Sequence, residues 1–381
     1  MMIDFSSLRA RFPVLSQKTY LNSASYCALA DSVKAAFESY MDDRLAVGAN
    51  WDVWVTKNEA VRTRVASFIN AAPDEVAVTA SVTAGLNALA SAMTFTGRRN
   101  RVVVTDFEFP TNAQVWHAQE MRGAEVVHVP RDADGYISLE QVEAAIDERT
   151  ALVAITHVCF RNGAKLDIAG VARLAHARGA QILVDSYQAV GSVAIDVKAL
   201  DVDYLVGGML KYMLGTAGIG FLYVRGELLP SLVPTHTGWF AQEDIAAMDI
   251  TANRPAPNAR RFEGGTPPVV NCYAAEAGLD ILLEVGGEAI ETRIRDLTAK
   301  CMDRLDAIGW PSVTPRADDR RGGMIAIRAS DSRGLSQALM ERDIVTSHRD
   351  DNLRASFHFY NNEQDIDVLI SALETLKPAF R

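Results

Sequence analysis

Short runs of apolar residues alternate with helical patterns along the middle of the chain, from about residue 75 to residue 225. Apolar runs of roughly four to eight residues bounded by turn residues are typical of buried strands, whereas apolar positions spaced three and four apart are typical of helices. Strands and helices that alternate in this way form βαβ units around a largely parallel sheet. The pattern predicts strands at Glu75–Thr79, Arg101–Thr105, Glu125–Val129, Ala151–Thr156, Gln181–Asp185, Tyr204–Gly207 and Gly220–Val224.

Helical patterns fill the segments between several of these strands. They predict helices at Thr83–Met93, Thr111–Arg122, Leu139–Ile146 and Asp167–Arg178. In sheets of this kind, ligands bind beyond the carboxyl ends of the strands. Polar and charged residues that follow those ends are therefore the first candidates for a functional site.

The pattern becomes irregular between His236 and Val270, where prolines and glycines are frequent. This composition predicts a long connection, and loops of that length in compact enzymes are usually functional. A helix is predicted to follow, from about Val270 to Val285 and onward past two glycines. Beyond it the pattern predicts a smaller α/β unit with strands at Met324–Arg328 and Leu353–Ser356 and a closing helix after Asn362.

A chain of 381 residues in which 49% are apolar has enough material for a substantial core and for more than one domain. We expect an α/β fold with a mostly parallel, seven-stranded sheet in a large domain and a smaller C-terminal α/β domain. The expected parts are an N-terminal arm that packs on the small domain (residues 1–20), the large domain (21–285) and the small domain (286–381).

Charge and cysteine usage limit the partners and the setting that we expect. The net charge of −10 and the pI near 5.3 disfavour nucleic-acid and anionic-membrane partners, which require a basic surface. No segment approaches the roughly 20 apolar residues of a membrane-spanning helix, and the N-terminus lacks the apolar region of a signal peptide. The cysteines are far apart, so we expect neither a disulfide framework nor a metal site, and a cytoplasmic setting. They are Cys27, Cys159, Cys272 and Cys301.

Lys211 is the first candidate for chemistry. It lies in the segment GGMLKYMLGTAGIG, and no other charged residue occurs between Asp203 and Arg225. Burial favours the neutral amine, which is the form that attacks an aldehyde. A lysine with a buried stem whose ammonium reaches solvent would give the same pattern, so the segment alone leaves both interpretations open.

Asp185 ends the predicted strand QILVD on the amino-terminal side of Lys211. A carboxylate at that position can hold the pyridine nitrogen of pyridoxal 5′-phosphate (PLP) protonated, and the protonated ring accepts electrons from a substrate. In the same turn, Gln188 offers an amide to the phenolic oxygen of that cofactor. An aspartate at a strand end also caps turns, so Asp185 alone does not identify a cofactor site. Asp185 and Gln188 together support a PLP site more strongly than either residue does alone.

A phosphate site is indicated at ASVTA, which joins a predicted strand to the helix that begins near Thr83. Free backbone N–H groups and the helix dipole favour an anion there, and Thr83 adds a hydroxyl donor. Thr83 would also serve as a simple helix N-cap. Phe109, in DFEFPTN after the next strand, is placed to stack on a planar ring, although core packing explains most lone phenylalanines.

Read in order, the motifs of this chain resemble the class V aminotransferase superfamily of PLP-dependent fold type I enzymes. That superfamily includes cysteine desulfurases, selenocysteine lyase, kynureninase and isopenicillin N epimerase. The resemblance covers nearly the whole chain, from YLNSAS to HFYNNEQDID. It rests on the motifs SVTAGLNAL, HVCFRNG, VDSYQAVG, LKYMLG, GWFA, FEGGTPP and LRASFHFYN.

The resemblance implies a role for each candidate residue. Lys211 would carry PLP as a Schiff base, Asp185 would pair with the pyridine nitrogen, Gln188 would face the phenolic oxygen and Phe109 would stack on the ring. Residues expected at the phosphate are Val82 and Thr83, together with Thr266 and Trp239 from the neighbouring subunit of a homodimer. Residues expected at the substrate are Arg354, which would bind the α-carboxylate through its planar fork, and Ser23.

Two departures from the family pattern bear on the site. Many relatives place side-chain phosphate donors immediately before the lysine, whereas Gly208, Met209 and Leu210 offer none here. Because these donors are missing, Thr266 and Trp239 are expected to contribute more to phosphate binding than in those relatives. Cys159 stands where relatives often have an asparagine, and we expect a buried, inert thiol there.

The reaction type follows less directly from the sequence. Cysteine desulfurases need a nucleophilic cysteine just before the carboxylate arginine, but IVTSHRDDNL contains none, so we do not expect a persulfide-forming desulfurase. We expect a lyase acting on an α-amino acid, which removes the Cα proton through Lys211 and then cleaves a C–S or C–C bond at the β-carbon. An aminotransferase or epimerase would use the same cofactor residues. A non-catalytic ligand-binding relative is disfavoured by the joint presence of Lys211, Asp185, Gln188 and Arg354.

Overall fold

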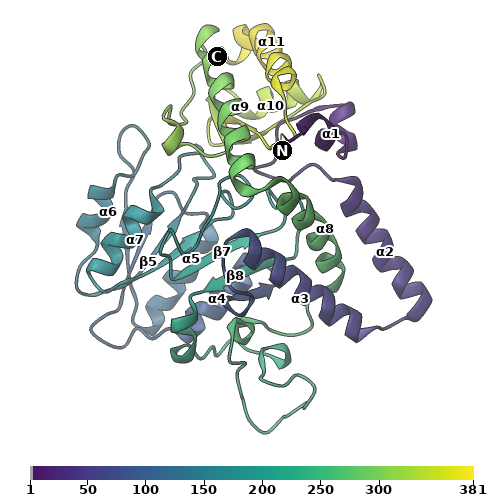
Figure 1. Ribbon diagram of the computed structural model, residues 1–381. Helices are drawn as coiled ribbons and strands as arrows, with labels where there is room; N and C mark the ends of the chain where they lie inside the picture. The colour runs from purple at the N-terminus through teal and green to yellow at the C-terminus, as the bar shows by residue number, and fades with distance from the viewer. Residues whose placement is uncertain (1–2) are drawn as a thin grey trace.

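Seven strands form one mixed sheet at the centre of the fold (Figure 1), which the computed structural model describes for residues 3–381. The strand order is β2-β8-β7-β6-β5-β3-β4, and only β8 runs antiparallel to its neighbours. The predicted α/β fold with a mostly parallel, seven-stranded sheet is therefore confirmed. The strands are β2 (Val76–Thr79), β3 (Arg101–Thr105), β4 (Glu125–Val129), β5 (Thr150–Thr156), β6 (Gln181–Asp185), β7 (Tyr204–Gly208) and β8 (Gly220–Val224).

Helices cover both faces of this sheet because successive strand residues point to opposite sides. Val103 and Val153 belong to a core shared with α3, α7 and α8, whereas Val102 and Ala154 belong to a second core shared with α4 and α5. Apolar residues on both faces explain why the strands read as nearly continuous apolar runs. These helices are α3 (Trp51–Phe68), α4 (Val82–Ala92), α5 (Pro110–His117), α6 (Leu139–Ala145), α7 (Ile168–Ala177) and α8 (Val269–Val285).

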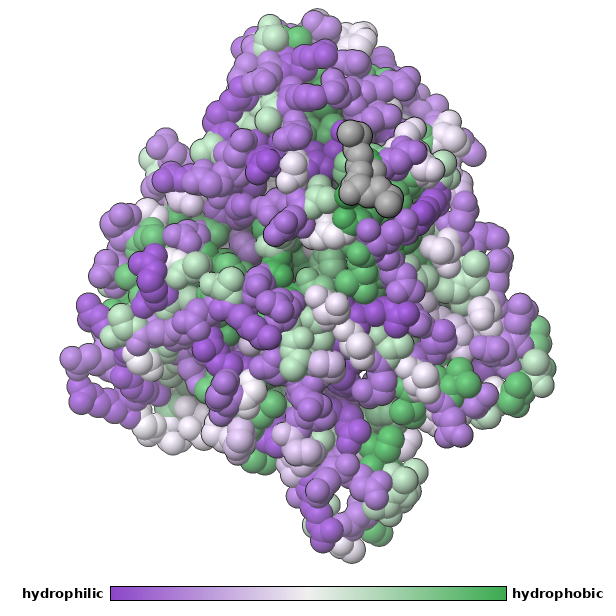
Figure 2. Space-filling model, in the orientation of Figure 1, coloured by the Kyte–Doolittle hydropathy of each residue, from purple (hydrophilic) through white to green (hydrophobic). Residues whose placement is uncertain are grey.

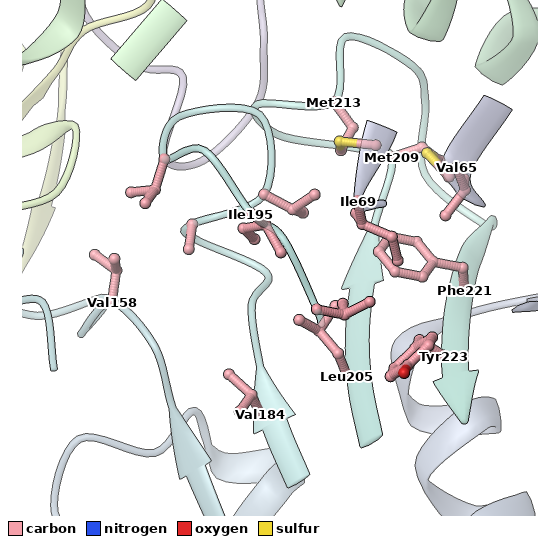
Figure 3. Packing of buried hydrophobic residues seen from close by; sticks show 14 of the residues in the cluster. Val65, Ile69, Val158, Val184, Ile195, Leu205, Met209, Met213, Phe221 and Tyr223 are labelled. Atoms are coloured by element: carbon pink, nitrogen blue, oxygen red, sulfur yellow. The ribbon is translucent and has the colours of Figure 1, made fainter. Parts of the chain in front are cut away.

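The segment that follows β7 is anchored in the first of these cores. Figure 3 shows Met209 and Met213 packed near Val65 of α3, near Ile69 just after that helix and near Phe221 of β8. Both methionines have no exposed surface. Their burial fixes the backbone that carries Lys211, which lies between them in the sequence.

The largest departure from the predicted elements lies near the N-terminus. There α2 (Asp31–Val47) and α3, which were not among the predicted helices, form a helical hairpin. Both helices pack along α8, but Val33 is the single buried residue of α2. The apolar pattern did not predict α2 because so little of it is buried. A smaller difference occurs in the predicted helix Thr111–Arg122, which divides into α5 and a 3-10 turn at Ala118–Arg122.

A smaller α/β unit lies above the sheet in Figure 1 and has its own apolar core. Its three-stranded antiparallel sheet has the order β11-β12-β9. Helix α9 contributes residues to both cores, Ile290 and Ile294 to the large one and Leu297 and Leu305 to the small one. The elements of this part are α9 (Gly287–Ala307), β9 (Met324–Arg328), α10 (Ser332–Met340), β10 (Ile344–Val345), β11 (Ser347–Arg349), β12 (Asn352–Ser356) and α11 (Glu363–Phe380).

The N-terminal residues contact both parts of the molecule. After α1 (Phe5–Arg9), strand β1 (Thr19–Tyr20) pairs in parallel with β10. Arg9 forms an ion pair with Asp365 of α11 at 2.8 Å, and Arg11 pairs with Glu284 of α8 at 2.6 Å. The division into residues 1–20, 21–285 and 286–381 remains a proposal, in which the second boundary falls at the junction of α8 and α9.

The predicted long connection between β8 and α8 is irregular, with short 3-10 turns at Trp239–Ala241 and Ala259–Phe262. Its central part projects from the lower edge of the molecule in Figure 1. Within residues 3–381, none of the helices has the length and apolar character needed to cross a membrane.

Candidate active site

A cavity of about 270 Å³ lies at the carboxyl ends of the central strands and extends to the start of α4. Thr156 and Asp185, the last residues of β5 and β6, line it. The cavity brings together Lys211, Asp185, Gln188, Phe109, Val82 and Thr83 from the predicted site. It also includes Ser81, Thr111, Val158, Phe160, Tyr187, Leu210, Gly218 and Ile219.

Lys211 occupies a tight turn just beyond β7. Its carbonyl accepts a hydrogen bond from the N–H of Leu214, whose φ of 59° is uncommon for a residue other than glycine. The Lys211 Nζ lies 4.4 Å from the ring centroid of Tyr187 and 5.7 Å from that of Phe109. Burial lowers the pKa of Lys211 to about 8, although the charge of Asp185 opposes this effect. The side chain therefore faces the cavity and loses its proton more readily than an ordinary lysine.

Asp185 is 5% exposed at the inner end of the cavity. Its Oδ1 accepts a hydrogen bond from the N–H of Tyr187 at 3.0 Å, which fixes the carboxylate. Burial raises the pKa of Asp185, whereas this hydrogen bond and the charge of Lys211 lower it. A cationic partner in the cavity would stabilise the ionised carboxylate further.

Gln188 follows in the same turn and is also buried. Its Nε2 donates to the carbonyl of Ala24 at 3.0 Å. Because an amide nitrogen carries two hydrogens, this bond fixes the side chain and leaves a second donor for a ligand.

The start of α4 also lines the cavity, through Ser81, Val82 and Thr83. Ser81 caps this helix, because its Oγ accepts a hydrogen bond from the N–H of Ala84 at 3.1 Å. The N-cap role considered for Thr83 therefore belongs to Ser81. The first N–H groups of a helix have no partner within it, so those of Val82 and Thr83 are available to an anion.

Phe109 is 44% exposed, although it lies at the cavity between β3 and α5. Its ring meets that of Phe160 edge to face, with centroids 5.2 Å apart. Partial exposure distinguishes Phe109 from the core phenylalanines and leaves a ring face open toward the cavity.

Beneath Phe109, the carboxylate of Glu108 accepts a dense set of buried hydrogen bonds. The donors are the hydroxyls of Thr105 and Thr156, the amide of Asn112 and the backbone N–H of Thr156, at 2.6–2.9 Å. Burial raises the pKa of Glu108 to about 7, and the hydrogen bonds lower it only partly. This network joins the backbone at Phe109 to Thr156, which lines the cavity.

Arg354 lies on β12 and is 3% exposed. Its Nη1 donates to the carbonyl of Phe160 at 2.7 Å, its Nη2 to the hydroxyl of Ser25 at 3.0 Å and its Nε to that of Ser347 at 3.2 Å. Burial lowers the pKa of Arg354 to about 10, and the charge of Arg349 adds to this effect. The guanidinium is thus held beside the cavity wall formed by Phe160.

Three predicted site residues lie elsewhere in this subunit. Ser23 is fully buried, and its hydroxyl is hydrogen-bonded to that of Tyr360 at 2.7 Å. Trp239 packs edge to face on Trp51, with centroids 5.6 Å apart. Thr266 is exposed and lines a separate hollow that includes Ala80 and Ala84, so it reaches the α4 turn from its other side.

The structure also adds residues that the sequence analysis did not assign to the site. Tyr187, Phe160 and Thr156 line the cavity, and Ser25 contacts Arg354. Tyr187 lies between Asp185 and Gln188, and Phe160 lies in HVCFRNG, so both were within motifs that had been singled out. Cys159 is 1% exposed, and burial raises the pKa of its thiol to about 11.

Comparison with known proteins places this geometry in a family. The family described as Aminotransferase class-V matches residues 50–369. The chain is 36% identical over 361 residues to the uncharacterized aminotransferase YcbU of Bacillus subtilis, covering 94% of each chain. It is 31% identical over 408 aligned positions to a cysteine desulfurase of Cronobacter sakazakii, covering 98% of each chain.

Solved structures share the whole fold. An apo cysteine desulfurase from Thermococcus onnurineus has a TM-score of 0.89 at 24% identity, covering 99% of this chain and 98% of that one. A C-DES variant with glycine covalently linked to its PLP cofactor has a TM-score of 0.87 at 22% identity, covering 98% and 99%. These likenesses confirm the fold expected for PLP enzymes of fold type I. Since the family match spans well over half of the sequence and several relatives cover nearly all of it, this chain belongs to the class V aminotransferase family of PLP-dependent enzymes.

Proposed function

We propose that this protein binds PLP and acts on an α-amino acid as a lyase that cleaves a C–S or C–C bond at the β-carbon. The observation that carries the proposal is the arrangement of Lys211, Asp185 and a helix N-terminus around one cavity. A lysine of lowered pKa, a buried carboxylate and an anion site are the groups needed for an aldehyde, a pyridine nitrogen and a phosphate.

The donor set fits PLP along its whole length. Lys211 would hold the cofactor, Asp185 its ring nitrogen and Gln188 its phenolic oxygen, while Phe109 would cover one face of the ring. The N–H groups of Val82 and Thr83 would bind the phosphate. When bound, PLP serves as an electron sink that makes the bonds at a substrate Cα labile.

Lys211 supplies the proton transfer. A general base is most effective when its pKa lies near the operating pH, and the pKa of Lys211 is about 8. The Nζ would take the proton from Cα and hold it beside the cavity. Departure of a group from the β-carbon would then complete the lyase reaction.

Arg354 would bind the α-carboxylate of the substrate. Its hydrogen bonds to Phe160 and Ser25 fix the guanidinium while leaving further N–H groups for a bidentate contact. A substrate held in this way presents a defined Cα bond to Lys211. Ser23 is proposed to act only indirectly, through its buried hydrogen bond to Tyr360.

The cysteines support a lyase that works without an enzyme-bound persulfide, in contrast to the cysteine desulfurases among its relatives. Every cysteine in the sequence is buried, including Cys159 beside the cavity wall. Burial raises the pKa of Cys27 to about 12 and that of Cys159 to about 11, which disfavours the nucleophilic thiolate. The segment before Arg354 is a tight β-hairpin, β11–β12, without a cysteine.

An aminotransferase or epimerase is the alternative within the same family. The 36% identity to YcbU, which is described as an uncharacterized aminotransferase, favours this second candidate. Both reactions would use Lys211, Asp185, Gln188 and Arg354 in the same roles. The residues that decide between the reactions contact the substrate side chain.

We also propose that the protein is a homodimer with active sites at the subunit interface. Helix α2 exposes Met41, Leu45 and Val47, and the projecting loop exposes Met248 and Ile250. Figure 2 shows apolar side chains at the tip of the α2–α3 hairpin and beside that loop. A second subunit on these surfaces would bury them and bring Thr266 and Trp239 to a neighbouring phosphate site.

Cysteine usage supports a cytoplasmic setting.

A substrate screen separates the candidate reactions. Purified protein loaded with PLP is incubated with single amino acids and their S-conjugates, with and without a 2-oxo acid. Release of ammonia and a 2-oxo acid from one substrate would support the lyase. Amino transfer that requires the added 2-oxo acid would establish the aminotransferase instead, and loss of optical purity alone would establish the epimerase.

A further inference from the structure

A second arginine shares one face of the β11–β12 hairpin with Arg354. In the register of this pair, Ser347 lies opposite Arg354, and Arg349 lies opposite Asn352. Side chains directly opposite each other in an antiparallel pair share a face, and so do residues two apart on one strand. Arg354 on this face donates a hydrogen bond to the carbonyl of Phe160, which lines the cavity, so the face lies toward the cavity wall. Arg349 therefore lies on the same face, two residue pairs away from the Ser347–Arg354 pair.

Arg349 has no compensating carboxylate on this face. Within residues 3–381, no Asp or Glu oxygen lies within 4.0 Å of its guanidinium. The adjacent Asp350 is bound by Arg161, whose Nη1 lies 2.9 and 2.8 Å from the two carboxylate oxygens. Asp350 thus serves to hold the hairpin against the Phe160–Arg161 segment.

The positive charge of Arg349 affects the pKa values of two residues of the site. After burial, it is a cause of the lowered pKa of Arg354, and it also contributes to the lowered pKa of Lys211. Arg349 is thus close enough to Arg354 and Lys211 for its charge to affect both, whereas the buried carboxylate of Asp185 is assigned to the cofactor ring. An incoming α-carboxylate would neutralise a single charge and leave another uncompensated. This surplus favours a substrate with a second negative group.

We propose that Arg349 binds an anionic group on the substrate side chain, so that the enzyme acts on acidic α-amino acids in preference to their neutral counterparts. This inference rests on the proposed function and narrows its substrate class. The anionic group is a carboxylate, sulfinate or sulfonate carried at or beyond the β-carbon. Arg354 then binds the α-carboxylate, and Arg349, which is exposed on the same face of the hairpin, binds the distal group.

The test uses PLP-loaded protein and matched pairs of amino acids of similar size. Aspartate is compared with asparagine, glutamate with glutamine, and cysteine sulfinate with cysteine. Dissociation constants are obtained from the change in cofactor absorbance on binding. The variants are Arg349→Gln, which removes the charge, and Arg349→Lys, which keeps it. Arg333→Gln, on the exposed face of α10, is the control.

We expect the native protein to bind the acidic member of at least one pair roughly tenfold more tightly, as for one hydrogen bond to a charged group. Arg349→Gln should lose this preference without weakening the neutral member, Arg349→Lys should restore part of it, and Arg333→Gln should match the native protein. Equal or weaker binding of the acidic members by the PLP-loaded native protein would overturn the inference alone. A protein that takes up no PLP, or whose cofactor responds to no amino acid, would overturn the proposed function together with it.

Discussion

Burial determines the charge state of the residues at the reacting centre. Lys211 and Asp185 lie in the same cavity, and burial lowers the pKa of the first and raises that of the second. Each group is therefore closer to neutrality than it would be in water, and each is poised to interact with a bound cofactor. The backbone of Lys211 is rigid because Met209 and Met213 anchor it on both sides.

Replacement of Arg354 by lysine tests how the substrate is held. Lysine keeps the charge but offers one point of contact where arginine offers a planar fork. We expect Arg354→Lys to keep bound PLP and to lose about 100-fold in kcat/KM, the scale associated with a small misplacement of a reacting group. Steady-state kinetics and cofactor absorbance provide the measurement. Loss of the cofactor, or native turnover, would show that Arg354 has a structural role.

Glu108 provides a test of the buried network beneath Phe109. Its pKa of about 7 lies above that of an unfolded glutamate, near 4.3, so the unfolded protein loses this proton at lower pH. The contribution of Glu108 to stability is therefore greatest below about pH 4.3 and decreases as the pH rises toward 7.

We expect Glu108→Gln, which cannot ionise, to abolish this decrease. The difference in the free energy of unfolding between the native protein and the variant should change by on the order of 3 kcal/mol between pH 4 and pH 8. Urea unfolding of the cofactor-free proteins across this range measures it, with Glu148→Gln, at an exposed position, as the control. A difference that stays constant with pH would mean that Glu108 has the same pKa in the folded and the unfolded protein, contrary to the effect of burial.

At the scale of elements, the hairpin of α2 and α3 leaves apolar side chains exposed that the proposed homodimer would bury. Most helices of the large part bury an apolar stripe, but α2 buries only Val33 along its length. Its apolar residues near the C-terminal end face solvent, with Leu45 84% exposed. A second subunit packed on these residues, as in the proposed homodimer, would stabilise α2, because packing of an apolar face contributes more than propensity does.

A charge at Leu45 should therefore separate the subunits without disturbing the fold. We expect Leu45→Glu to weaken the dimer by at least tenfold in its dissociation constant, because the carboxylate would be buried in the interface. Sedimentation velocity over a range of concentrations measures this effect. Met121→Glu, at another exposed apolar residue, is the matched control and should leave association unchanged. Equal behaviour of the two variants would remove the α2 surface from the interface.

For the molecule as a whole, the sheet could be predicted almost to the residue. Strands such as Arg101–Thr105 and Gln181–Asp185 are short apolar runs bounded by turn residues, and both faces of the sheet are covered. Helix α2 could not be predicted from apolar periodicity because the apolar face that would reveal it is largely exposed in one subunit.

The residues of the candidate site could be predicted from the sequence about as well as the strands of the sheet. Asp185 was identified because it ends a strand, and Lys211 because no other charged residue occurs between Asp203 and Arg225. The sequence analysis named Ser23 as a substrate residue, whereas in the structure Ser25 contacts Arg354. Two serines in YLNSAS point in directions that only tertiary packing decides. For the same reason, the sequence could not reveal Glu108, whose donors come from different elements.

Completion of the phosphate site by a second subunit is a prediction for the assembled molecule. Gly208 and Leu210 supply no side-chain donors, so a contribution from Thr266 would matter more than usual. We expect Thr266→Ala to weaken PLP binding several-fold, in line with the loss of one hydrogen bond of about 1 kcal/mol. Dialysis against buffer without PLP, followed by absorbance, measures retention. If retention were unchanged in a protein confirmed to be dimeric, Thr266 would not contact the phosphate.

The central claim is that Lys211 holds PLP. The most direct measurement is reduction of the PLP-loaded protein with sodium borohydride, followed by protease digestion and mass spectrometry to locate the modified lysine. We predict a single pyridoxyl group on the peptide that contains Lys211, and loss of both this adduct and the cofactor absorbance in Lys211→Ala. A protein that takes up no PLP, or an adduct on another lysine that persists in Lys211→Ala, would contradict the account.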